Sequence, residues 1–205
     1  MNSRILTLFL LVGVVVSGIA LVPKLGSYHL PGNHQDYEPG QPIAFSHRLH
    51  AGELQISCVY CHSGAEKSRH AGFPATSVCM NCHKSVTASS GELRENPQAI
   101  SDELRKLYDT FGLDKNLKHD PNKAQPVPWV RVHNLPDFAY FDHRAHVNSG
   151  VACQKCHGPV ETMERVRQVE SLSMGWCVNC HRDVNATGVN GKKVHASLDC
   201  AACHY

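Results

Sequence analysis

Cysteine and histidine form the clearest chemical pattern in this chain. All ten cysteines of the 205 residues fall into C-x-x-C pairs, and a histidine directly follows each pair. With 15 histidines in the chain, five such followers by chance have a probability on the order of one in a million. In chain order, motifs 1 to 5 are Cys58/Cys61/His62, Cys79/Cys82/His83, Cys153/Cys156/His157, Cys177/Cys180/His181 and Cys200/Cys203/His204.

A C-x-x-C-H motif is typical of covalent haem attachment. The two thiols reach the vinyl groups on one porphyrin edge, and the histidine that follows reaches the iron. We therefore expect five covalently bound haem c groups. Tetrahedral zinc sites are an alternative, but they need no histidine after each pair, and the fifth pair would have no partner. A disulfide framework or a thioredoxin-like site leaves the histidines unexplained, and the chain shows no βαβ pattern. The expected proximal iron ligands are His62, His83, His157, His181 and His204.

The remaining histidines are numerous enough to supply a second ligand to each iron. The segment Phe45–His50 recurs as Phe141–His146, each time about ten residues before a motif. Histidines three residues apart point to the same side of a helix or turn, yet two cannot share one iron face, so each should serve a different haem. The predicted distal ligands are His47, His50, His143 and His146.

The fifth distal ligand is less well defined by the sequence. Its candidates are His133, His195 and the thioethers of Met163 and Met174, and we prefer the two histidines. The other histidines lie in polar or glycine- and proline-flanked stretches, where a solvated surface role is expected. They are His29, His34, His70 and His119.

Further likeness between the two halves indicates an internal duplication. CHSGAE at 61–66 matches CHGPVE at 156–161, and CMNCHKSV at 79–86 matches CVNCHRDV at 177–184. We expect a two-haem module at 40–90, a helix and connector at 91–135, and a three-haem module at 136–205.

The expected fold is mainly α with much irregular structure, because so few residues per haem cannot build an ordinary core and the porphyrins must form it. An apolar stripe predicts a helix at 97–111 that ends at Gly112. The polar and then proline-rich stretch 113–136 predicts an extended connector. Its alternative is a docking arm that displays Trp129 and Val130 to a neighbouring subunit.

The N-terminal segment predicts export. Residues Ile5 to Val22 carry no charge and as a helix would reach about 27 Å, enough for a single transmembrane anchor within residues 1–25. A cleaved signal peptide is the alternative. Both place the motifs on the extracytoplasmic, periplasmic side of the inner membrane. The net charge of +2 comes without a basic run dense enough for nucleic acid.

The F-x-H-x-x-H segments followed by C-x-x-C-H resemble the class III multihaem cytochromes c, in which such histidines ligate different haems. Residues 41–205, from QPIAFSHRLHAGELQISCVYCH to DCAACHY, are similar to the pentahaem cytochrome c subunits of alternative complex III. That resemblance implies an electron relay beside an iron–sulfur or molybdopterin-like subunit and polytopic quinol-binding subunits. It also implies delivery to a monohaem cytochrome c or a terminal oxidase.

Three function classes follow from these patterns. A relay without catalytic residues of its own needs every iron capped on both sides, and the spare histidines outnumber the irons. A stand-alone membrane-anchored quinol dehydrogenase or reductase would leave one iron open to substrate. A haem-bearing structural tether is the third alternative.

Overall fold

The computed structural model describes residues 3–25 and 33–204, and within them the chain is mainly helical with long irregular stretches. β-structure in this part is limited to isolated bridges. The expected mainly α fold with much irregular structure is confirmed. The longer helices are α1 (Ser3–Leu25), α3 (Thr76–His83), α5 (Asp102–Phe111) and α8 (Met174–Thr187). The short ones are η1 (Arg48–Glu53), α2 (Cys58–Cys61), α4 (Ser90–Glu95), α6 (His143–Asn148), α7 (Gln154–His157), η2 (Val160–Thr162) and η3 (Cys200–Ala202).

Helix α1 covers the uncharged segment that the sequence predicts to be a membrane anchor. Among the residues that the structure describes, however, no helix combines the length and apolar character needed to cross a bilayer.

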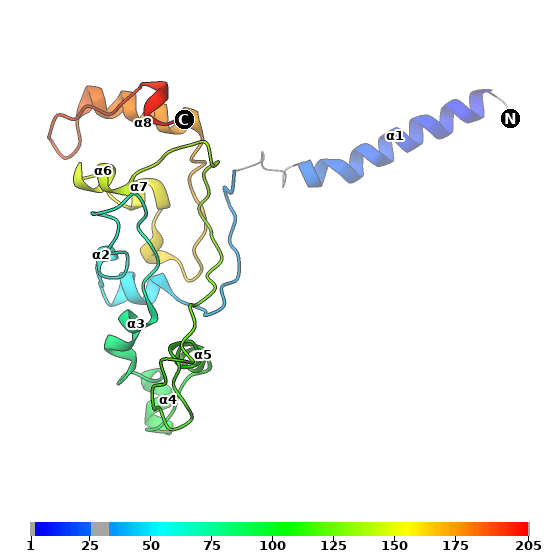
Figure 1. The fold of residues 1–205 in the computed structure, drawn as a ribbon. Coiled ribbons are helices and arrows are strands. Elements are labelled where there is room, and N and C mark those ends of the chain that lie inside the picture. The colour runs from blue at the N-terminus through cyan, green and yellow to red at the C-terminus, as the bar shows by residue number, and fades with distance from the viewer. Residues whose placement is uncertain (1–2, 26–32, 205) are drawn as a thin grey trace.

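Helices α2 to α8 are arranged along a long axis (Figure 1). Helices α4 and α5 lie at one end, followed by α3 and then α2. Helices α6 and α7 come next, and α8 lies at the opposite end together with the C-terminus. Helix η1 packs against η2, and α3 packs against α5. The order of the helices in space therefore differs from their order in the sequence.

Few apolar side chains are buried in the described residues. One cluster joins Ile43 to Leu107 and Tyr108 of α5, and Cys79 and Met80 of α3 pack against it. The Tyr108 hydroxyl donates a hydrogen bond to the His83 carbonyl oxygen, which ties α5 to motif 2. The buried apolar residues are Ile43, Ala65, Ala88, Leu107, Tyr108 and Val132.

The helix expected at 97–111 forms only in its second part, as α5. The early start was wrong because Asn96 adopts an extended backbone and its side chain organises a turn. Ser101, at the N-cap position of α5, is also extended. The predicted end is confirmed: Gly112 has φ of +82°, which a glycine adopts without strain.

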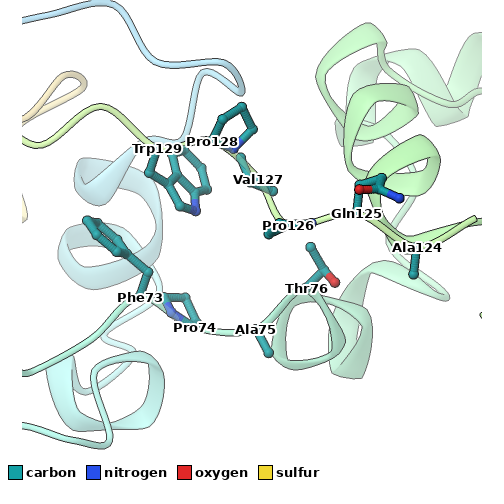
Figure 2. Close-up of a pocket in the computed structure, with 10 residues that line it drawn as sticks. All are labelled: Phe73, Pro74, Ala75, Thr76, Ala124, Gln125, Pro126, Val127, Pro128 and Trp129. Carbon is teal, nitrogen blue, oxygen red and sulfur yellow. The ribbon is translucent and has the colours of Figure 1, made fainter.

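No helix forms between Gly112 and Asp142. Trp129 packs partly buried against the apolar cluster, whereas Val130 is exposed, so the docking-arm interpretation keeps one of the two residues it displays and stays a prediction. Val130 exchanges two hydrogen bonds of 2.9 Å with the Gln41 side chain. Residues 124–129 face residues 73–76 across a groove of ≈ 680 Å³ (Figure 2), with Phe73 on the side opposite Trp129.

The two halves of the chain meet where η1 lies on η2. Gly52 of η1 lies so close to the Glu161 carbonyl that an added Cβ would overlap with it. Beside this contact, Arg48 forms an ion pair with Glu164. The Asn148 side chain of α6 also donates to the Glu66 carbonyl oxygen at 3.2 Å.

Replacement of Gly52 by alanine should therefore separate the two halves locally. We expect Gly52→Ala to lower the free energy of unfolding by about 1–3 kcal/mol, as for other over-packed sites. Denaturant unfolding of the haem-loaded protein, followed by the Soret band, measures this change. Gly40→Ala is the matched control, because no atom lies within 4 Å of its added Cβ. Equal stability of the two variants would contradict the close approach.

Candidate functional site

Each C-x-x-C-H motif adopts a helical turn. In motifs 1, 3 and 5 the histidine amide donates to the carbonyl of the first cysteine, at 2.9, 3.0 and 2.9 Å. Motifs 2 and 4 lie within α3 and α8. A helical turn brings residues three apart to the same face, so both thiols of a motif point to one side and the histidine follows directly. This arrangement suits the two vinyl groups and the iron of one haem.

Four of the proximal histidines face a predicted distal histidine. The ring centres of these pairs lie 6.5, 6.1, 6.3 and 6.0 Å apart, and the angles between the ring planes are 3°, 58°, 9° and 36°. In the same order the pairs are His47 with His62, His50 with His83, His143 with His157, and His146 with His181.

These distances fit an iron atom between the two rings. Because a metal–imidazole nitrogen bond is about 2 Å long and the nitrogen lies about 1 Å from its ring centre, two rings on opposite faces of one iron have centres about 6 Å apart. Each distal histidine also faces a different motif, as the H-x-x-H spacing predicts. The donor set therefore fits c-type haem, and ligation of each iron stays a prediction.

Hydrogen bonds at Nδ1 leave the other ring nitrogen available to a metal. A ring that donates its Nδ1–H to a carbonyl presents Nε2 as a bare lone pair. The proximal rings of His62, His83 and His181 bond to the carbonyls of Gly72, Val86 and Ser197 at 2.7, 2.8 and 2.6 Å. The distal rings of His50, His143 and His146 bond to those of Ser46, Arg69 and Asp142 at 2.9, 2.7 and 2.8 Å.

Two phenylalanines repeat the duplication in the site itself. Phe45 stacks on His50 with ring centres 4.3 Å apart and meets His47 edge-on at 4.9 Å. Phe141 stacks on His146 at 4.5 Å and meets His143 edge-on at 4.8 Å. Sequence reasoning overlooked these side chains as part of the site, although the repeated F-x-H-x-x-H pattern contained the signal.

His133 lies against a proximal histidine. Its Nε2 is 3.1 Å from Nδ1 of His157, and the two rings meet at 77° with centres 4.3 Å apart. Burial lowers the pKa of His133 to about 4, and the charge of His143 lowers it further. Burial also lowers the pKa of His157 to about 3, followed by the charges of His133 and His143. Both rings are therefore neutral near pH 7. This edge-on contact, with centres 4.3 Å apart, leaves less space between the rings than the four facing pairs have. The role of His133 as a distal ligand stays a prediction.

Burial also governs the ring of His47. It lowers the pKa of His47 to about 4, and the neighbouring rings of His62 and His50 lower it further. Nδ1 of His47 is buried and has no hydrogen-bond partner among the described residues.

Motif 5 lacks a facing imidazole in the described part of the chain. The ring contact described for His204 is with Phe138, at 5.8 Å, and the Phe138 carbonyl oxygen lies 3.4 Å from its Nδ1. His195 is exposed, as is Met174, whereas Met163 is half-buried. The identity of the fifth distal ligand stays a prediction.

The four histidines expected at the surface have different outcomes. His70 and His119 are exposed, although His119 stacks on Phe111. The surface role was wrong for His34, which is half-buried because its Nδ1 bonds to the Val132 carbonyl oxygen at 3.2 Å. His29 lies outside the described residues.

The thiols show which motifs lie beside motif 1. Burial raises the pKa of Cys61, and the thiols of Cys58 and Cys82 raise it further. Burial also raises the pKa of Cys153, and Cys58 adds to the rise through its charge and a hydrogen bond. Motif 1 thus lies beside both motif 2 and motif 3.

The pKa values of the thiols also show the order of motifs 3, 4 and 5 in the second half. Burial raises the pKa of Cys156 to about 11, and the next contributions come from Cys180 and Cys177 of motif 4. Burial raises the pKa of Cys177, followed by the charge of Cys203 in motif 5. Together with the helix order in Figure 1, the motifs form one row in the order 2, 1, 3, 4, 5.

Comparison with known proteins agrees with this geometry. The chain is 27% identical over 184 residues to the "Menaquinone reductase, multiheme cytochrome c subunit" of Nitratidesulfovibrio vulgaris (strain Hildenborough), a match that covers 80% of this chain and 76% of that protein. Residues 43–100 and 139–205 match the family model for cytochrome c7 and related cytochrome c. These ranges contain all five motifs and all four facing histidines, and the chain belongs to the family of cytochrome c7 and related multihaem cytochromes c.

Proposed function

We propose that this chain is the pentahaem electron-relay subunit of a quinol-oxidising membrane complex of the alternative complex III type. The observation that carries the proposal is the single row of five motifs, four of which have a second imidazole facing the proximal one. Haem c supplies one-electron redox chemistry when it is bound. A row of closely spaced attachment sites suits transfer along the protein better than turnover at one centre.

The side chains divide this task among themselves. The ten cysteines would hold the porphyrins, and the paired histidines would bind the iron atoms. Backbone carbonyls such as those of Gly72 and Ser197 hold the imidazole planes and tautomers. We assign no catalytic residue to the chain itself, and quinol chemistry would belong to another subunit.

The proposed partners follow from the resemblance to alternative complex III. They are an iron–sulfur or molybdopterin-like subunit, polytopic quinol-binding membrane subunits, and a downstream monohaem cytochrome c or terminal oxidase. The relative's printed name favours a second candidate, in which the chain serves a menaquinone-reducing complex and electrons travel toward the quinone.

Native electrophoresis of mildly solubilised membranes tests both candidates. We expect a large haem-stained band that contains this chain with iron–sulfur and multi-span subunits and that oxidises quinol. A band of the same composition that reduces menaquinone with an electron donor but does not oxidise quinol would support the second candidate. A small band of this chain alone that still oxidises quinol would contradict the relay and make the chain a stand-alone enzyme.

Removal of one distal ring should open one iron only. In His146→Leu we expect five haems to remain, because the cysteines and proximal histidines are intact, and one of them to become high-spin and to bind carbon monoxide when reduced. Optical and electron paramagnetic resonance spectra measure this change. His70→Leu is the control, because His70 is exposed, and all its haems should stay low-spin. An entirely low-spin His146→Leu protein would contradict the proposed pairing with His181.

Carbon monoxide binding to the reduced wild-type protein would point to an open iron, which the stand-alone reductase requires.

We also propose an extracytoplasmic location with residues 1–25 retained at the membrane. The uncharged run from Ile5 to Val22 supports this location, as do the ten cysteines in C-x-x-C-H motifs, which haem attachment would cap in an oxidising compartment. Cell fractionation and mass determination of the mature chain measure it. We expect an intact N-terminus in the membrane fraction, extracted only by detergent. A periplasmic chain that begins near Ala20 would identify a cleaved signal peptide instead.

A further inference from the structure

The ring of His157 differs from the other facing histidines in the hydrogen-bond partner of its Nδ1 atom. Six of the described rings in facing pairs bond through Nδ1 to a backbone carbonyl. Nδ1 of His157 instead meets Nε2 of the His133 side chain at 3.1 Å. The two rings meet edge-on at 77°, with their centres 4.3 Å apart.

The direction of this hydrogen bond follows from the iron site. His157 uses Nε2 toward the iron, so its Nδ1 keeps the proton and donates it. His133 must then accept at Nε2 and carry its own proton on Nδ1. A neutral imidazole nitrogen is a much stronger base than a carbonyl oxygen, so the bond draws the His157 proton farther from its ring. The His157 ring thereby becomes a stronger electron donor.

The backbone around His133 holds its ring in place. Val132 is buried, and its carbonyl oxygen bonds to the His34 ring at 3.2 Å. On the other side, the Asn134 amide donates at 3.1 Å to the side chain of Gln168, which is fully buried. Both neighbours of His133 are thus fixed by segments far away in the sequence, which is typical of a residue with a positioning role.

We propose that His133 is a positioning residue that orients His157 and lowers the reduction potential of the haem at motif 3. This inference rests on the proposed ligation by His157 but not on the identity of the larger complex. Motif 3 lies at the centre of the row, so its potential relative to the neighbouring sites sets how electrons divide between the two halves of the protein.

Spectroelectrochemical titration of three variants of the full-length, haem-loaded protein tests the proposal. In His133→Phe and His133→Leu, which remove the acceptor, we expect one of five midpoint potentials to rise while every haem stays low-spin. In His133→Gln the amide oxygen restores an acceptor, so that potential should return part of the way. His70→Phe should leave all five potentials unchanged, because His70 is an exposed histidine.

Three results would overturn the proposal. Unchanged potentials in the variants without an acceptor would show that the contact does not tune the haem. A new high-spin haem would show that His133 is itself an iron ligand. A uniform shift of all five potentials would indicate a general structural effect. The readout is independent of quinol activity, so it separates a failure here from a failure of the proposed relay function.

Discussion

The geometry of two imidazoles on one iron is the constraint on which this structure depends. It requires ring centres about 6 Å apart and a bare Nε2 on each ring. Four pairs in the structure have this separation. In these pairs every Nδ1 except that of His47 has a hydrogen-bond partner that leaves Nε2 available. Each pair joins a distal segment to a motif elsewhere in the chain. The pairs therefore link short helices that share little apolar surface, and few apolar residues beyond the α5 cluster are buried in the described part. With the predicted ligation, coordination would take over much of the task that apolar packing performs in an ordinary domain.

The internal duplication explains why both halves of the chain contain facing pairs of imidazoles. Phe45 and Phe141 hold their two histidines in nearly the same way, one ring stacked and the other edge-on. The copies are not independent, because the Nδ1–H of His143 in the second copy bonds to the Arg69 carbonyl in the first. A predicted ligand of one half is thus oriented by the backbone of the other, and the close approach of η1 to η2 fixes the same boundary.

Local patterns in the sequence predicted the parts of the site that are built locally. A motif holds its thiols and histidine within five residues, and the repeated H-x-x-H spacing predicted that its histidines face different motifs. The carbonyl partners of Nδ1 were not predictable, since any residue type supplies a carbonyl and only the fold brings Gly72 to His62 or Ser197 to His181. The helix expected at 97–111 began too early because the Asn96 side chain competes for local backbone hydrogen bonds. The sequence indicated His133 as a candidate distal ligand, but its contact with His157 depends on the path of the connector.

The two central motifs show why the acceptor at Nδ1 matters. His47 with His62 and His143 with His157 have nearly parallel rings, at 3° and 9°, as expected of duplicated sites. The Nδ1 contacts of their proximal rings differ: His62 bonds to the Gly72 carbonyl, whereas His157 meets the imidazole of His133. A backbone carbonyl cannot be changed by substitution, but a side-chain acceptor can. Position 133 therefore allows the sequence to adjust one site in the middle of the row without moving the backbone that holds the other four.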